Sequence, residues 1–146
     1  MASPITRQDF TTTIRELDGK TVERLEVMVV TWDGAVEDAQ RALLKVRGGR
    51  WHRFLVDAGV LFWEEQDSVD ESDRDTHSPD PRRTYALRTV DEAAGARLGV
   101  VRMEQVEDEA RLTIGFADGR RLVFTQRGAG TDGEATSMEW RAAGQR

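Results

Sequence analysis

The 146-residue chain contains no cysteine. Disulfide bonds, thiol catalysis and cysteine-ligated zinc are therefore excluded. Histidine is almost as scarce, because it occurs only at His52 and His77, and a zinc site built from three histidines is excluded as well. A chain without cysteine fits a reducing compartment, so we expect a cytoplasmic protein.

Long apolar runs are also missing. The longest, Ala58–Trp63, has six residues, whereas a membrane-spanning helix needs roughly 20. The opening residues have no basic region followed by an apolar core, so the sequence predicts no signal peptide and no membrane association. With 38% hydrophobic and 33% charged residues, we expect one folded domain over 1–146 with short flexible ends at 1–8 and 142–146.

The net charge of −6 is concentrated in one segment. Between Glu64 and Asp80 there are eight acidic residues and one arginine, so this segment carries −7 and the rest of the chain +1. The preceding stretch, Ala39–Val56, has five basic residues and no acid. The two segments could pair, within one chain or across a homodimer, or each could form a separate solvated face. Exposed ion pairs contribute little to stability, which favours the solvated faces.

Strand-like patterns dominate the chain. Nine segments combine alternating or continuous apolar residues with turn residues at their ends. They are Phe10–Leu17, Thr21–Trp32, Trp51–Val56, Val60–Glu65, Arg83–Val90, Leu98–Val106, Leu112–Phe116, Arg121–Gln126 and Thr136–Arg141. Asp18-Gly19 is typical of a hairpin turn between the first two. Apolar residues on both faces late in Thr21–Trp32 indicate that both sides of that strand are covered.

A single helix is expected at Ala35–Val46, with a strand through Ala42-Leu43-Leu44 as the alternative. There Val36, Ala39, Leu43 and Val46 are three or four residues apart, and Gly48-Gly49 follows as a stop signal. No repeat period is evident in the sequence. The predicted fold class is therefore mainly β (α+β), an antiparallel sheet of about nine strands rolled into a barrel or sandwich, with one amphipathic helix packed on it.

The candidate binding residues lie in one aromatic hairpin and in the acidic loop 66–81 that follows it. This loop is longer than ordinary connections, so we expect it to extend into water and to be mobile or functional. The hairpin has two tryptophans, which fill cores or anchor interfaces. The candidate residues are Trp51, His52, Trp63, Glu64, Glu65, Asp67, Asp70, Glu71, Asp73 and Asp75.

Several kinds of chemistry find little support. Gly128–Gly133 matches Gly-x-Gly-x-x-Gly, but a dinucleotide site needs a helix and a strand afterwards and only 13 residues remain. Asp73, Asp75 and His77 alternate as a cation site would, yet the glycine and terminal glutamate of a calcium loop are missing. No serine lies in a nucleophile elbow. The sequence therefore predicts no catalytic residue, no metal site and no cofactor.

Function is expected to lie in protein binding. An acidic segment steers association with basic partners, so the first hypothesis is a non-enzymatic cytoplasmic protein-binding module of inhibitor or immunity type, able to form a homodimer. The basic stretch around Trp51 resembles a nucleic-acid surface, but the pI near 5.0 and the adjacent acids weigh against that ligand.

Two alternatives remain. One is a small-molecule-binding β-barrel whose apolar pocket is lined by Trp32, Phe54, Phe62 and Phe124. The other is a hydrolase that uses His52 with carboxylates, for which Glu64 and Glu65 would need a partner from another strand because adjacent strand residues point to opposite faces.

Overall fold

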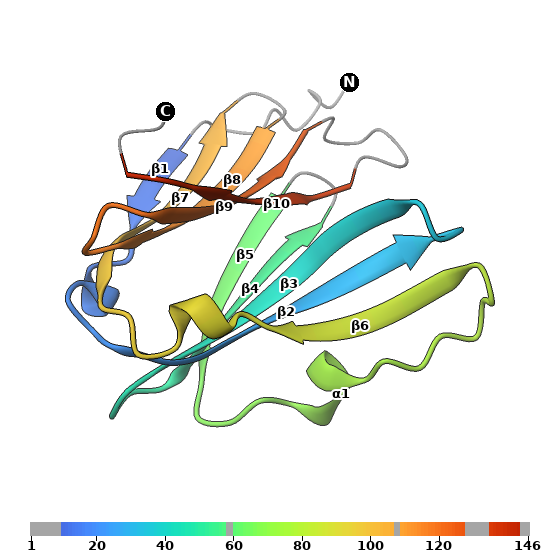
Figure 1. Cartoon of the computed structure of the whole chain (residues 1–146), viewed down its shortest axis with the longest axis horizontal. Coiled ribbons are helices and arrows are strands. Elements are labelled where there is room, and N and C mark those ends of the chain that lie inside the picture. Colours follow the sequence, from blue (N-terminus) through green and yellow to red (C-terminus); the bar gives the residue numbers. More distant parts are fainter. Residues whose placement is uncertain (1–9, 58–59, 107–108, 128–134, 144–146) are drawn as a thin grey trace, which may run out of the picture.

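The computed structural model describes residues 10–57, 60–106, 109–127 and 135–143. Within these residues ten strands form two antiparallel sheets of five strands each (Figure 1). Sheet 1 has the order β5-β4-β3-β2-β6, and sheet 2 the order β1-β7-β8-β9-β10. The strands of sheet 1 are β2 (Val22–Trp32), β3 (Val36–Val46), β4 (Trp51–Asp57), β5 (Val60–Gln66) and β6 (Arg83–Thr89). Those of sheet 2 are β1 (Phe10–Thr13), β7 (Leu98–Val106), β8 (Glu109–Phe116), β9 (Arg121–Gln126) and β10 (Ser137–Arg141).

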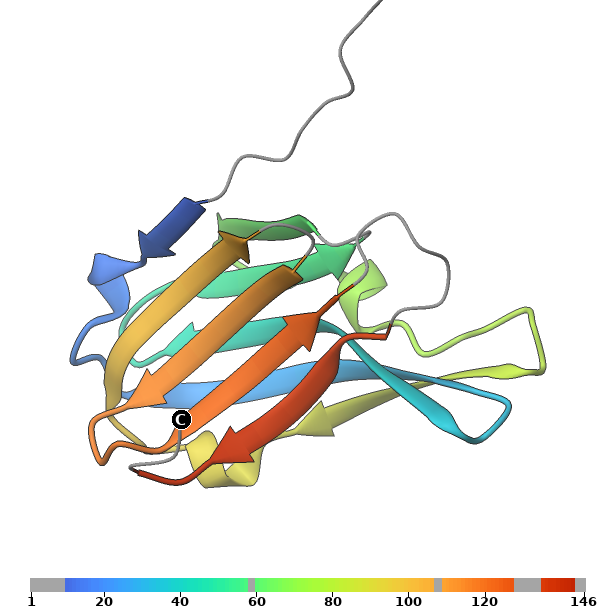
Figure 2. The same cartoon turned by 90° about the horizontal axis from the view of Figure 1, so that it is seen from above.

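The two sheets pack face to face and their strands cross at an angle (Figure 2). Alternate residues of each strand point between the sheets, where Leu25, Val27 and Phe54 of sheet 1 meet Ile114 and Phe124 of sheet 2 in one buried core. The sheets are not closed into a barrel, so of the two architectures predicted the arrangement is consistent with the sandwich. The prediction of a mainly β, antiparallel fold is confirmed.

The predicted helix at Ala35–Val46 is wrong, because this segment is strand β3. Ala39, Ala42, Leu44 and Val46 face the core, and a bulge opposite Met28 and Val29 adds one residue between Ala39 and Ala42. Leu43 points to the other side of the sheet and is buried there as well. A bulge and burial on both faces together produce apolar spacings of three and four, which imitate a helix.

The predicted hairpin at Asp18-Gly19 is also wrong. β1 pairs with β7 in sheet 2, whereas β2 belongs to sheet 1, so the chain crosses between the sheets here. The crossing begins with a short 3₁₀ helix, η1 (Arg15–Leu17), and Gly19 takes the positive φ of 72° that follows it. A second short 3₁₀ helix, η2 (Asp91–Ala93), follows β6.

The structure contains an internal repeat that the sequence does not reveal. η2 is followed by Gly95 with φ 80°, and η1 by Gly19 with φ 72°, so the two crossings are 76 residues apart. Their hydrogen bonds correspond one to one: the Ile14 amide donates to the Val101 carbonyl, and the Val90 amide donates to the Leu25 carbonyl. A repeat is therefore present in the structure, although no repeat period is evident in the sequence.

The two halves exchange their first strands. β1 leaves the first half to pair with β7, and β6 leaves the second half to pair with β2. The crossings meet at a bridge between Thr21 and Arg97, residues that correspond under the same offset of 76. Each half therefore contributes four strands to one sheet and one strand to the other.

Residues 67–82, called the insert below, connect the halves. The insert contains α1 (Glu71–Arg74) and lies on the outer side of sheet 1, away from sheet 2 (Figure 1). Met28, Val30 and Leu43 are buried although they do not belong to the core between the sheets. β2 is thus covered on both sides, as its apolar pattern predicted.

Candidate functional site

The insert is attached to sheet 1 by a carboxylate that accepts hydrogen bonds from two arginines. Asp73 Oδ1 accepts from Arg41 Nη1 and from Arg53 Nε, each at 2.9 Å. The Asp73 side chain is only 5% exposed and the two arginines about 20%. Arg41 and Arg53 reach it from neighbouring strands, because β3 and β4 pair with Leu43 opposite Arg53 and Leu55 opposite Arg41. The expectation that this acidic segment extends freely into water is wrong at Asp73.

Arg74 attaches the insert a second time. Its guanidinium donates to Glu26 Oε1 of β2 through Nη2 at 2.6 Å and through Nε at 3.1 Å. The same group lies over the Trp51 ring of β4, 5.1 Å from its centroid, as in a cation–π contact. Glu26 is almost completely buried, so its charge requires such a partner. Opposite charges on the insert and on the sheet therefore pair within one chain, and the interpretation of two separate solvated faces is corrected.

The other acids of the insert remain on the surface. Asp70 caps α1 by accepting the Ser72 amide at 3.1 Å, and these hydrogen bonds lower the pKa of Asp70. Asp67 is 88% exposed and contacts Arg50. Glu71 and Asp75 are exposed too. The attached insert thus presents an outward acidic face whose backbone position is set by Asp73 and Arg74.

A small polar cavity, called the insert pocket below, lies where the insert meets sheet 1. It has a volume of about 180 Å³, and its lining includes Arg41, Asp75, His77, Tyr85 and Met28. The Asp75 carboxylate accepts the His77 amide at 2.8 Å, which fixes this turn of the insert. Nε of Arg41 is buried, and the described residues give it no hydrogen-bond partner. Donors, a carboxylate and an apolar floor are therefore gathered in a space that suits a small polar group.

On the opposite side of sheet 1, His52, Trp63 and Glu65 face sheet 2. The Trp63 indole Nε1 donates to His52 Nδ1 at 3.0 Å, and the two rings are stacked. Glu65 lies opposite His52 in the strand register. Burial lowers the pKa of His52, although the nearby Glu65 carboxylate acts in the opposite direction. The imidazole is therefore held neutral and its Nδ1 is occupied by Trp63.

The internal repeat shows what is unusual about this group. His52 pairs with Leu44 and Glu65, and the register of the second half puts Leu122 and Trp140 at the matching positions. An apolar pair in one half is thus a polar pair in the other. Of the carboxylates that the hydrolase hypothesis would combine with His52, the structure places Glu65 opposite His52 and Glu64 on the other face of the sheet.

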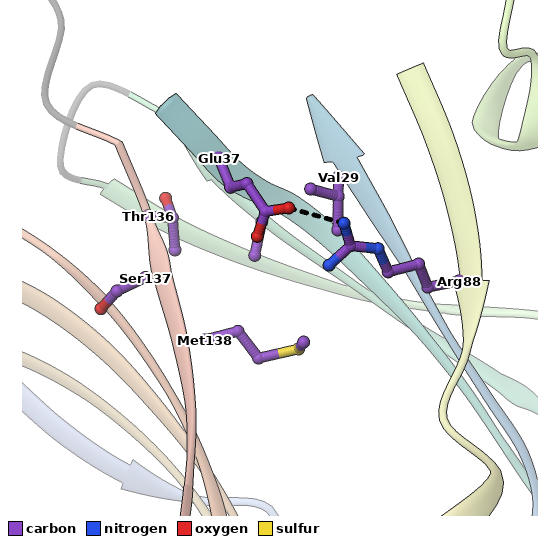
Figure 3. Close-up of a pocket in the computed structure, with 7 residues that line it drawn as sticks. Val29, Glu37, Arg88, Thr136, Ser137 and Met138 are labelled. Atoms are coloured by element: carbon purple, nitrogen blue, oxygen red, sulfur yellow. Dashed lines mark hydrogen bonds and ion pairs between the residues drawn. The ribbon is translucent and has the colours of Figure 1, made fainter. Parts of the chain in front are cut away.

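A second cavity opens at the edge of the sandwich between β6 and β10 (Figure 3). Its volume is about 200 Å³, and Val29, Arg88, Thr136 and Met138 contribute to its lining. Arg88 donates to Glu37 Oε1 at 2.6 Å across the cavity, which lowers the pKa of Glu37. The Thr136 hydroxyl is buried and has no hydrogen-bond partner among the residues that the structure describes.

Family models, curated proteins and solved structures were compared with the chain, and none of them matches it. Among the described residues, no three metal-binding side chains gather in one place. None of the helices described is both long and apolar enough to cross a bilayer. The function of this chain is therefore inferred from its own geometry.

The candidate residues chosen from the sequence fall into two groups. One group belongs to the outer side of sheet 1 or to the insert and consists of Trp51, Glu64, Asp67, Asp70, Glu71, Asp73 and Asp75. The other group faces the core and consists of His52, Trp63 and Glu65. Trp51, His52 and Glu65 therefore do not converge. The glycine motif Gly128–Gly133 and the chain ends 1–8 and 144–146 lie outside the described residues.

Sequence reasoning missed the partners of the insert. Arg41, Arg53 and Arg74 bind it to sheet 1, and Tyr85 lines the insert pocket. The acid-free stretch that contains Arg41 and Arg53 was the available signal. The four aromatics expected around one apolar pocket are separated, because Phe54 and Phe124 are buried in the core while Trp32 and Phe62 are 38% and 51% exposed.

Proposed function

We propose that this protein is a non-enzymatic binding module that recognises a basic surface of a partner protein with the outward face of the insert. The observation that carries the proposal is the double attachment of the insert through Asp73 and Arg74. An acidic loop held in one conformation loses little conformational entropy when it binds, so its charges can contribute to affinity as well as to the association rate.

An apolar anchor lies on the same side of sheet 1. Phe62 of β5 is 51% exposed, and it pairs with Leu55 on the outer surface. Exposed aromatics surrounded by charged residues are typical of the energetic centres of protein interfaces. The proposed interface therefore combines Phe62 with the exposed acids Glu64, Asp67, Glu71 and Asp75.

Affinity capture with a charge-neutralised insert tests this proposal. The triple variant Asp67→Asn/Glu71→Gln/Asp75→Asn removes three outward charges and retains Asp70, Asp73 and Arg74. We expect it to lose partners that the wild type captures at low salt. The matched control Glu16→Gln/Asp18→Asn/Glu92→Gln removes three exposed acids at the two crossings and should capture the same partners as the wild type. Equal capture by all three proteins would refute the proposal.

Phe62→Ala tests the contribution of the apolar anchor to binding separately from that of the acidic residues. Truncation of a central aromatic costs about 2 kcal/mol or more of binding energy, or roughly 30-fold in affinity, and should act on the dissociation rate. The triple variant, in which three acids are neutralised, should instead associate more slowly and with a weaker salt dependence. Identical kinetics for the two variants with a captured partner would contradict the division of roles.

A second candidate function is the binding of a small molecule in the edge cavity between β6 and β10. The unpartnered Thr136 hydroxyl favours it, because a buried polar group without a partner costs free energy that a ligand acceptor or donor would recover. Met138→Trp should fill this cavity and abolish such binding, while leaving capture by the insert unchanged.

A further inference from the structure

The internal repeat places an arginine at matching positions of the two sheets. Arg41 of β3 lies opposite Met28, and Arg111 of β8 lies opposite Glu104, which is 76 residues after Met28. Both arginines have a buried Nε that finds no hydrogen-bond partner in the described part of the chain. Arg41 binds the Asp73 carboxylate of the insert. Over the corresponding outer face of sheet 2, the described part of the chain places no such segment (Figure 2).

Four arginines gather on this open face. Each of four adjacent strands contributes one arginine to the lining of a hollow of about 320 Å³: Arg102, Arg111, Arg121 and Arg141. Thr113 and Glu104 also line this hollow. Val123 also lines the hollow and is only 2% exposed, so the guanidinium groups surround an apolar floor. We call this set of side chains the arginine face.

The arginine face is poorly neutralised by the protein itself. Arg111 pairs with Glu109 at 3.2 Å and Arg141 with Glu139 at 3.4 Å. Arg102 and Arg121 form no ion pair within the described residues. Arg121 and Arg141 lie directly opposite each other on β9 and β10. Like charges at opposite positions of an antiparallel pair destabilise a sheet, and an anion bound between them would remove that repulsion.

We propose that the arginine face binds the phosphate group of a phosphorylated small molecule, with pyrophosphate as the simplest member of this class. In sheet 1 two arginines hold one carboxylate, whereas four arginines and one carboxylate, Glu104, line the hollow of sheet 2. Because Arg111 and Arg141 already pair with Glu109 and Glu139, the guanidinium groups without a carboxylate partner in the described part of the chain are those of Arg102 and Arg121, and two such groups suit an anion of two charges. Guanidinium groups form paired hydrogen bonds with phosphate oxygens, and Thr113 adds a hydroxyl donor.

Titration calorimetry with sodium pyrophosphate tests this site. The intact protein is titrated in a low-salt buffer without phosphate and compared with Arg121→Gln and Arg102→Gln. We expect each variant to bind at least about tenfold more weakly, because a hydrogen bond to a charged group is lost. The matched control Arg47→Gln removes one exposed arginine from the turn between β3 and β4 of sheet 1 and should bind as the wild type does.

Stability measurements guard against a trivial loss of folding. Without pyrophosphate, Arg121→Gln should melt at the temperature of the wild type or above it, since the substitution removes the repulsion from Arg141. Pyrophosphate should raise the melting temperature of the wild type and of Arg47→Gln, and raise that of Arg121→Gln much less.

Three results would overturn the proposal. The first is the absence of any heat or stabilisation with pyrophosphate. The second is equal binding by Arg121→Gln, Arg102→Gln and the wild type, which would place the anion elsewhere. The third is tight binding of oligothymidylate that pyrophosphate does not displace and that Arg121→Gln abolishes, which would assign the arginine face to a nucleic-acid polymer. Because insert-mediated capture does not involve these residues, it can fail or succeed independently.

Discussion

Replacement of Asp73 by asparagine should release the insert from sheet 1. The substitution retains the size of the side chain and removes the charge that Arg41 and Arg53 share at 2.9 Å. Loss of one member of a buried ion pair costs about 3–5 kcal/mol. Because the two arginines are 19% and 20% exposed, water can solvate them in part, and we expect a smaller loss of about 2–3 kcal/mol.

Urea unfolding followed by tryptophan fluorescence measures this loss, since Trp51 lies under the Arg74 guanidinium. A protein of this size should melt roughly 5–10 °C lower. Limited trypsin digestion should also cut after Arg74 sooner than in the wild type. Asp67→Asn is the matched control, because Asp67 is 88% exposed and its pair with Arg50 should contribute at most about 1 kcal/mol. Equal stability and equal cleavage for the two variants would refute the reasoning.

Three further predictions concern the interior. His52→Leu should remove part of the loss of stability on acidification. Burial lowers the His52 pKa from its ordinary 6.5, so the unfolded chain binds the proton more readily and the stability of the wild type falls as the pH drops below about 6.5. Urea midpoints at pH 7.5 and 5 compare the two proteins, and equal pH dependence would contradict this prediction. Trp63→Phe should cost about 1–2 kcal/mol in urea unfolding, because His52 Nδ1 loses its donor; an unchanged midpoint would show that the bond contributes nothing. Gly115→Ala should lower the free energy of unfolding by about 1–3 kcal/mol, and with it the melting temperature, since the new Cβ would lie 2.6 Å from the Val100 carbonyl oxygen. An unchanged melting temperature would mean that the strand pair can separate there.

Local patterns were sufficient to predict most of the sheet. β2, β7 and β9 end close to where alternation and turn residues put them. β3 was missed because a bulge changes the phase of its side chains and because Leu43 is buried outside the core. The pairing of β1 with β7 could not be read from neighbouring residues, since it joins segments about 90 residues apart.

The candidate site was predicted in composition and not in geometry. Opposite charge on Ala39–Val56 and on the insert indicated that the two could meet, yet the sequence does not show which acid is buried. Asp73 is buried because α1 turns it toward two arginines, while Asp67 and Glu71 in the same stretch remain exposed. The arginine face was invisible for a related reason: its members come from four strands and are brought together only by the register of sheet 2.

The exchange of β1 and β6 has a consequence for how the sandwich comes apart. Each five-stranded layer has one outer strand supplied by the opposite half of the sequence, so neither half can complete its hydrogen-bond ladder by itself. If one half of the chain unfolds, the sheet of the other half loses its outer strand and is left with an open edge. The two sheets therefore unfold as one cooperative unit. A cut within the insert would therefore leave two fragments that remain paired through β1 and β6, each of which completes a sheet of the other fragment.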